Sequence, residues 1–445
     1  MLPQKIIHTL SGVLEKVIDS RLQLFFKKEN NKAFAYPAIK SSKRDKSALN
    51  TFIHDHKLNN EELTILLLAF MPHVQPNFLD SIIQQYLPNG GEFPEIGGVK
   101  GSNHRGTIPT GETALFIIAG NDIDKRIKAS AYFSPDHFFA KENILSLEQV
   151  KEGEPRMSGK LMLQQEYVDL FTTGIISKPV FGAEFPAKLV TTKMEWKDLV
   201  LNPKTALPIS DIKIWLEHNN RLIDEWKMDK RIKPGYRALF YGPSGTGKTL
   251  TATLLGKQFK KDVYRIDLSQ VVSKYIGETE KNLEKIFVKA EHKDWILFFD
   301  EADALFGKRS NVQNAHDKYA NQEVSYLLQR VEDFPGLIIL ASNYKSNIDQ
   351  AFVRRFNTII QFPIPDAEER FKLWVSALPP GATLAEDISL ENIAAKYELT
   401  GSSIVNVIHY VCLKAMANDS NIITKPSLLE GIKREYEKED RVFKP

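Results

Sequence analysis

Short runs of apolar residues alternate with longer amphipathic segments in the middle of this 445-residue chain. The runs lie at 236–241, 263–266, 295–299, 337–341 and 358–362. A short, continuous apolar run is typical of a strand that is buried on both faces. Because helical segments separate the runs, the pattern predicts an α/β fold with helices on both faces of a parallel sheet.

The regions on either side of this predicted sheet have helical patterns instead. Before it, apolar residues recur at helical spacing over 6–26, 46–54, 61–70 and 78–86, and 114–119 fits a strand or a helix. A Pro-containing stretch at 181–208 is typical of a linker, and 209–230 predicts another helix. After the sheet, 366–445 is charged and helical, without strong strand signals. We therefore expect a mainly helical N-terminal domain at 1–185, an α/β domain at 186–364 and a C-terminal helical domain at 365–445.

Composition narrows the class of protein. Hydrophobic residues make up 42% of the chain and charged residues 26%, which is typical of a soluble globular protein. The net charge of +3 does not indicate a large nucleic-acid footprint, although a local basic patch is compatible with it. A single cysteine, Cys412, excludes an intrachain disulfide and a cysteine-based zinc site. The longest apolar stretch, Leu63 to Met71, is too short for a membrane span, and charges interrupt the N-terminal pattern, so we expect a cytoplasmic protein.

A glycine-rich turn that ends in Lys-Thr follows the first predicted strand directly. Residues 242–250 are Gly242, Pro243, Ser244, Gly245, Thr246, Gly247, Lys248, Thr249 and Leu250. Glycines allow positive φ and leave space for backbone N–H groups to surround phosphate oxygens. Lys248 adds a positive charge, the Thr249 hydroxyl is a candidate Mg²⁺ ligand, and the following helix directs its positive end at the anion. The motif predicts a P-loop NTPase sheet that binds a nucleoside triphosphate with Mg²⁺.

Polar residues end two further predicted strands. Asp300 and Glu301 follow the apolar run at 295–299, where Asp300 is placed to hold Mg²⁺ and Glu301 to polarise a water molecule. An Asp-Glu pair after a strand is also a common helix cap. Asn343 follows the run at 337–341 and is a candidate contact for the γ-phosphate or the water, although Asn at a strand end is often a turn residue.

Two adjacent arginines, Arg354 and Arg355, precede the last predicted strand. On a helix, successive side chains diverge by about 100° around the axis, so the two arginines point in different directions. In a monomer such a pair is usually solvated surface charge.

In this order, these elements resemble the AAA+ ATPases, in particular the AAA clade of ring-forming motors, over about 190–445. The resemblance implies that Asn343 is a sensor of the γ-phosphate, that Arg354 and Arg355 are arginine fingers acting on the neighbouring subunit, and that 366–445 is a lid. It also places Gly401 and Ser402 near the nucleotide base. The short Arg-Arg-Phe form looks like that of katanin-like severing enzymes and leaves open which arginine is the finger. A homo-oligomer, hexameric by family analogy, is therefore expected.

The segment 272–280 resembles the first pore loop of protein-remodelling members of this family. Lys274, Tyr275, Ile276 and Gly277 would line a central channel, where the Tyr275 ring offers a flat apolar face to a polypeptide. An ordinary helix start with Tyr275 packed in the core is the alternative. A second loop at 306–312 would face the channel or carry surface charges.

The N-terminal segment between Gly97 and Phe116 looks like the corresponding region of bacterial AAA ATPases encoded with contractile injection systems. A winged-helix-like fold is compatible with it, and such folds bind protein or DNA. Residues 110–113 echo a phosphate loop but lack its lysine. We expect an ATP-driven remodeller of protein substrates; the alternatives are a DNA-handling motor or loader and a non-enzymatic scaffold. Since the chain has no His-Glu-x-x-His motif, proteolysis would require another chain.

Overall fold

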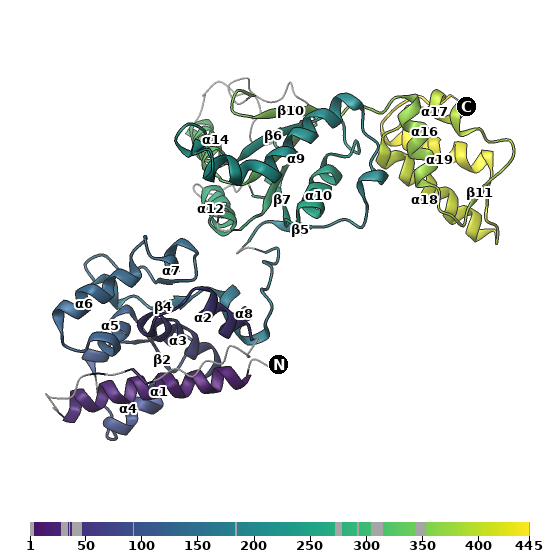
Figure 1. The fold of residues 1–445 in the computed structure, drawn as a ribbon. Coiled ribbons are helices and arrows are strands. Elements are labelled where there is room, and N and C mark those ends of the chain that lie inside the picture. Colours follow the sequence, from purple (N-terminus) through teal and green to yellow (C-terminus); the bar gives the residue numbers. More distant parts are fainter. Residues whose placement is uncertain are drawn as a thin grey trace. The chain divides into compact units, whose positions relative to one another are not determined.

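The computed structural model describes residues 4–27, 34, 36–37, 47–91, 93–182, 185–271, 278–291, 293–303, 315–343 and 353–444. The chain forms two compact units, Met1–Lys178 and Pro179–Pro445, which Figure 1 shows as ribbons. Among the described residues, no helix is both long enough and apolar enough to span a bilayer.

The first unit is built mainly of helices. They are α1 (Gln4–Lys27), α2 (Ala48–Asp55), α3 (Asn60–Val74), α4 (Phe78–Tyr86), α5 (Gly111–Ala119), α6 (Ile123–Ser130), α7 (Phe138–Lys141) and α8 (Gln165–Thr173). Two antiparallel pairs accompany them, β1 (Val99–Lys100) with β2 (Thr107–Ile108) and β3 (Leu145–Leu147) with β4 (Leu161–Leu163). The apolar run from Leu63 to Met71 is buried throughout as the central helix α3. The ambiguous segment 114–119 belongs to helix α5, which Thr110 caps.

The second unit contains a six-stranded sheet in the order β10-β6-β9-β8-β7-β5. Its strands are β5 (Lys188–Val190), β6 (Tyr236–Tyr241), β7 (Val263–Asp267), β8 (Ile296–Asp300), β9 (Leu337–Ser342) and β10 (Thr358–Gln361). All neighbours are parallel except β5, which is antiparallel to β7. The five predicted strands and the α/β fold are therefore confirmed. Strand β5 was not predicted, because it lies in the stretch interpreted as a linker.

Helices cover both faces of the sheet, as the continuous apolar strands require. On one face, Leu297 and Phe299 of β8 pack with residues of α12 (Glu278–Glu291) and α14 (Ala315–Asp333). On the other, Ile296 and Phe298 pack with residues of α9 (Pro203–Asp224) and α10 (Lys248–Phe259). A short helix, α11 (Leu268–Val271), follows β7.

The bounds predicted for the helix at 209–230 were wrong, because α9 begins at Pro203 and ends at Asp224. The Asn202 side chain caps α9 by accepting a hydrogen bond from the Lys204 N–H. Proline fits the first turn of a helix, where no N–H is needed, so Pro203 starts a helix in a stretch that resembled a linker.

Four helices form the C-terminal part of the second unit. They are α16 (Ala367–Ala377), α17 (Leu390–Lys396), α18 (Gly401–Ala417) and α19 (Lys425–Lys438). Trp374, Val411 and Ile432 are among the residues of their common core. A parallel pair of two-residue strands, β11 (Thr383–Leu384) and β12 (Ile422–Ile423), joins them. These strands were not predicted, since two residues are too short to produce a strand pattern.

Candidate functional site

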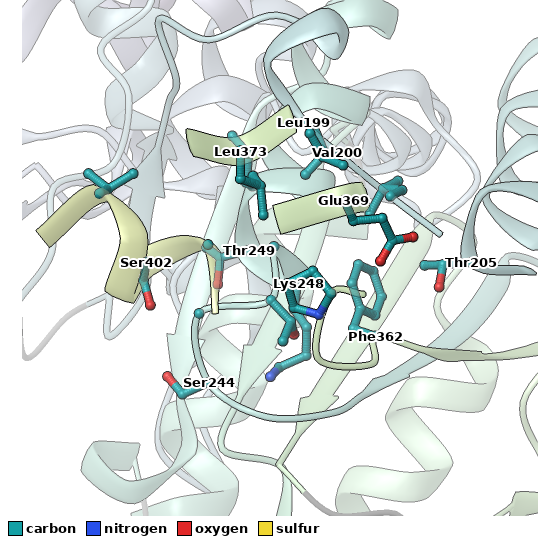
Figure 2. A pocket seen from close by; sticks show the side chains of 18 of the residues that line it. Leu199, Val200, Thr205, Ser244, Lys248, Thr249, Phe362, Glu369, Leu373 and Ser402 are labelled. Atoms are coloured by element: carbon teal, nitrogen blue, oxygen red, sulfur yellow. The ribbon is translucent and has the colours of Figure 1, made fainter. Parts of the chain in front are cut away.

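A cavity of about 640 Å³ lies in the second unit, at the carboxyl ends of β6, β8 and β9. In open α/β sheets this edge is the usual ligand site. The cavity is lined by the glycine-rich turn after β6, the segment before α9, the ends of β8 and β9, and residues of α16 and α18. Figure 2 shows it from close by, with side chains from these elements directed into it.

The glycine-rich turn has the backbone shape that its sequence predicts. Gly242, Gly245 and Gly247 have φ angles of 147°, 76° and 100°. A Cβ on Gly242 would lie 2.0 Å from the Phe362 carbonyl oxygen, and one on Gly245 would lie 1.8 Å from the Ser402 Oγ. Only glycine fits such positions, so the turn is an open backbone cradle suited to phosphate oxygens.

Lys248 at the start of α10 is buried, with 8% of its surface exposed. Its Nζ donates hydrogen bonds to the carbonyl oxygens of Gly242 (2.6 Å) and Pro243 (2.9 Å). Burial lowers the pKa of Lys248, while Asp300 and Asp303 raise it. A buried ammonium group at the head of a backbone cradle fits a polyanionic ligand such as a triphosphate.

The turn residues divide into two groups. Residues 244–250 line the cavity directly, including Thr249 and Leu250. Gly242 and Pro243 contribute through the carbonyl groups that hold Lys248. The Thr246 hydroxyl is committed to the Pro243 carbonyl, at 2.8 Å.

Asp300 ends β8, and both it and Glu301 line the cavity together with Thr249. Hydroxyl and carboxylate oxygens are the ligands that Mg²⁺ prefers, so Thr249 and Asp300 fit a magnesium site. Glu301 is exposed and has a positive φ of 52°, a backbone region that is uncommon for this residue type. Its backbone N–H donates to the Asp300 Oδ1 at 3.1 Å, which holds the Asp300 carboxylate against the backbone of Glu301.

Arg265 of β7 is a site residue that sequence reasoning missed. Its Nε lies 3.0 Å from the Asp300 Oδ2, and Arg265 lines the same cavity. The signal was present in the sequence, because Arg265 is the only charged residue in the predicted strand 263–266. Asn343, directly after β9, also lines the cavity and is exposed to it.

Residues of the C-terminal helices close one side of the cavity. The Ser402 N–H donates to the Gly245 carbonyl oxygen at 3.2 Å, so the start of α18 rests on the glycine-rich turn. Gly401 and Ser402 line the cavity, as does Leu373 of α16. The structure thus brings the predicted pair 401–402 to the site.

An apolar part of the cavity wall was not predicted. Leu199 and Val200 before α9 line it, together with Leu373, Ala377 and Val405 from the C-terminal helices. Apolar surroundings suit a nucleotide base. The run 199–201 is too short to indicate a binding wall in the sequence.

Arg354 and Arg355 are exposed and are not among the residues that line the cavity of their own chain. The Arg355 Nε lies 3.0 Å from the Glu332 Oε1 at the end of α14, and Glu332 also pairs with Lys233. These ion pairs hold the Glu332 pKa below its ordinary value, with Lys233 the largest cause. The predicted channel residues Lys274, Tyr275, Ile276 and Gly277, and the second loop at 306–312, lie outside the described residues.

Comparison with known proteins gives one family and several relatives. Residues 238–364 match the family described as "ATPase family associated with various cellular activities (AAA)". A proteasome-activating nucleotidase of Methanopyrus kandleri is 30% identical over 211 residues, which is 46% of this chain and 48% of the relative. The ATP-dependent zinc metalloprotease FtsH 2 of Sphaerobacter thermophilus is 24% identical over 378 residues, 79% of this chain and 54% of the relative. The peroxisomal ATPase PEX6 of Saccharomyces cerevisiae is 31% identical over 196 residues, 42% of this chain and 19% of the relative. The chain spans about half the length, or less, of these relatives.

Proposed function

We propose, from the match of residues 238–364 to the AAA family of ATPases, that the chain is a subunit of an ATP-hydrolysing ring that remodels proteins. The observation that carries the proposal is that one chain does not bring all the expected catalytic groups into its own cavity. The cavity contains a phosphate cradle, Lys248 and the carboxylates of Asp300 and Glu301, whereas Arg354 and Arg355 lie outside it. A neighbouring copy supplies the arginine in this proposal, so the ring is the active species.

Each group in the cavity has a proposed role. The turn 244–249 and Lys248 bind the phosphates, and Thr249 and Asp300 hold Mg²⁺. Bound Mg²⁺ supplies charge neutralisation on the phosphate oxygens. Glu301 orients and polarises the attacking water, and Asn343 contacts the γ-phosphate or that water.

Arg354 and Arg355 act in trans in this proposal. Arginine fingers in P-loop enzymes contribute on the order of 10³–10⁵ in rate, because they stabilise charge on the transferred phosphoryl group. A finger on one copy and a cradle on the next define a repeated head-to-tail contact, which closes into a ring. A hexamer is the proposed ring.

Protein is the proposed substrate. Two relatives, a proteasome-activating nucleotidase and an ATP-dependent zinc metalloprotease, have names that refer to action on proteins. Tyr275 in the proposed channel would grip an extended chain through its ring. Residues 97–116 resemble the corresponding region of bacterial AAA ATPases encoded with contractile injection systems, so we propose that the substrate belongs to such a particle.

The test mixes two inactive variants, Glu301→Gln and the double variant Arg354→Ala/Arg355→Ala. We expect each variant alone to lose ATP hydrolysis. In a 1:1 mixture, about one interface in four joins the intact Glu301 of one subunit to the intact arginines of its neighbour, and these interfaces should hydrolyse ATP. Full hydrolysis by the double-arginine variant alone would overturn the shared site.

The substrate class is tested separately. The Glu301→Gln variant, loaded with ATP and Mg²⁺, is expected to retain protein substrate that mass spectrometry identifies after purification. Tyr275→Ala is expected to hydrolyse ATP without remodelling that substrate. ATP hydrolysis stimulated by DNA, with a steep salt dependence, would favour the DNA-handling alternative instead.

A further inference from the structure

Glu369, in the first turn of α16, is a buried carboxylate in the wall of the nucleotide cavity. It is 8% exposed and is among the residues that line the cavity. Its Oε2 accepts a hydrogen bond of 2.9 Å from the Asp366 N–H, which completes the cap of the helix. Its Oε1 is also buried, and no donor reaches it within the part of the chain that the structure describes. A buried acceptor without a donor is costly, so this oxygen indicates a missing partner.

Three donor side chains near Glu369 in the chain or on the cavity wall already have other acceptors. The Thr205 hydroxyl, on the same wall, donates to the Gln361 carbonyl oxygen at 2.7 Å. The Ser376 hydroxyl donates to the Leu373 carbonyl oxygen at 3.0 Å. The adjacent Arg370 donates to the carbonyl oxygens of Ala394 (2.7 Å) and Pro365. The partner of the Glu369 Oε1 is therefore expected to come from the ligand.

The position of Glu369 indicates which part of a nucleotide it meets. Residues four apart on a helix share a face, so Glu369 lies in line with Leu373 and Ala377, both of which line the cavity. Leu199 and Val200 belong to the same apolar section. In Figure 2 the Glu369 side chain reaches from α16 in the direction of Thr205, well apart from Ser244 at the phosphate cradle. Glu369 is thus an acidic group of the section suited to a base; the other, Asp198, accepts a hydrogen bond of 2.8 Å from the Glu195 N–H.

We propose that Glu369 determines the base specificity of this site by accepting a hydrogen bond from the exocyclic 6-amino group of adenine. The inference rests on the proposed function, since it concerns the nucleotide that the ATPase consumes. A 6-oxo purine presents an oxygen at that position, which removes the 6-amino donor and places an acceptor against the carboxylate. Sites built to hydrogen-bond a ligand group reject analogues that lack it far more strongly than apolar sites do.

The first experiment needs no variant. Displacement of a fluorescent ATP analogue from the full-length chain gives the Kd of ATP, inosine triphosphate and purine riboside triphosphate, which carry an amino group, an oxygen and a hydrogen at position 6. We expect ATP to bind at least about tenfold more tightly than either analogue. Equal affinity for all three would overturn the proposal. If the parent chain binds none of them, the proposed function itself fails.

Glu369→Gln then tests the residue. The amide oxygen keeps the hydrogen bond from the Asp366 N–H, while the amide NH₂ replaces an acceptor with a donor. We expect the preference to move from ATP toward inosine triphosphate by about tenfold or more. Glu368→Gln is the matched control, because Glu368 is exposed and pairs with Lys372; it should keep the parent's ratios. Unchanged ratios in Glu369→Gln, with an unchanged melting temperature, would overturn the proposal.

Discussion

Gly245→Ala tests how the glycine-rich turn and the C-terminal helices fit together. Gly245 has a φ of 76°, which costs a residue with a Cβ about 1–2 kcal/mol. The new Cβ would lie 1.8 Å from the Ser402 Oγ and 2.8 Å from the Ser402 Cβ, whereas ordinary contacts begin at 3.4 Å. Overpacking of this kind costs about 1–3 kcal/mol more. The sum of about 2–5 kcal/mol predicts an ATP affinity at least about 30-fold weaker, because α18 must move off the turn that binds the phosphates.

A second substitution identifies the cause of that loss. Ser402→Gly removes both Ser402 atoms that the new Cβ meets, but it leaves the φ strain and the 2.8 Å contact with the Thr400 Oγ1. We expect the double variant Gly245→Ala/Ser402→Gly to bind ATP more tightly than Gly245→Ala, because the clash with Ser402 is gone. In a double-mutant cycle this gives a coupling free energy of more than about 1 kcal/mol between the two positions. Isothermal titration with ATP and thermal unfolding of all four proteins measure it. Parent-like binding by Gly245→Ala, or additive losses in the double variant, would refute the reasoning.

Three further predictions concern charged groups. Lys248→Met should weaken ATP binding by about 100-fold or more without lowering the melting temperature, because it removes a charge whose burial is unfavourable; a marked fall in melting temperature would contradict this. Arg354→Ala should lower the ATPase rate of the assembled protein more than Arg355→Ala, since Glu332 holds Arg355 in its own chain; equal losses in steady-state assays would argue against this. Since the pKa of Glu332 is lowered in the folded chain, its ion pairs stabilise the fold above the ordinary pKa of a glutamate and are lost as pH falls through the lowered value. Glu332→Gln should flatten that acidic part of the stability profile, and an unchanged profile would disprove it.

The strands and the phosphate cradle were predictable because local sequence determines them. The runs at 295–299 and 337–341 are apolar throughout since both faces of the sheet are covered, and amphipathic segments separate them from the other apolar runs of the sheet. Glycines followed by Lys-Thr after a strand permit few other backbone paths. For the same reason Asp300, Glu301 and Asn343 could be placed at one edge of the sheet.

Other parts of the site depend on contacts between distant segments. Strand β5 exists because it pairs with β7, where Leu189 lies opposite Tyr264, and three residues give no pattern of their own. Glu369 and Leu373 meet the segment 198–202 only after the C-terminal helices pack against the α/β domain. The pair of Arg355 with Glu332 likewise joins residues that are far apart in the chain. Sequence spacing contains no information on such contacts.

The ion pair between Arg265 and Asp300 has a consequence for the order in which the site is filled. A free divalent cation that approaches Asp300 competes with the guanidinium group of Arg265, whose Nε lies 3.0 Å from the Asp300 Oδ2. Phosphate oxygens arriving with the cation offer Arg265 a new anionic partner, so the exchange becomes favourable only when both enter together. We therefore expect the chain to take up the metal as a preformed complex with its nucleotide and to bind the bare ion weakly.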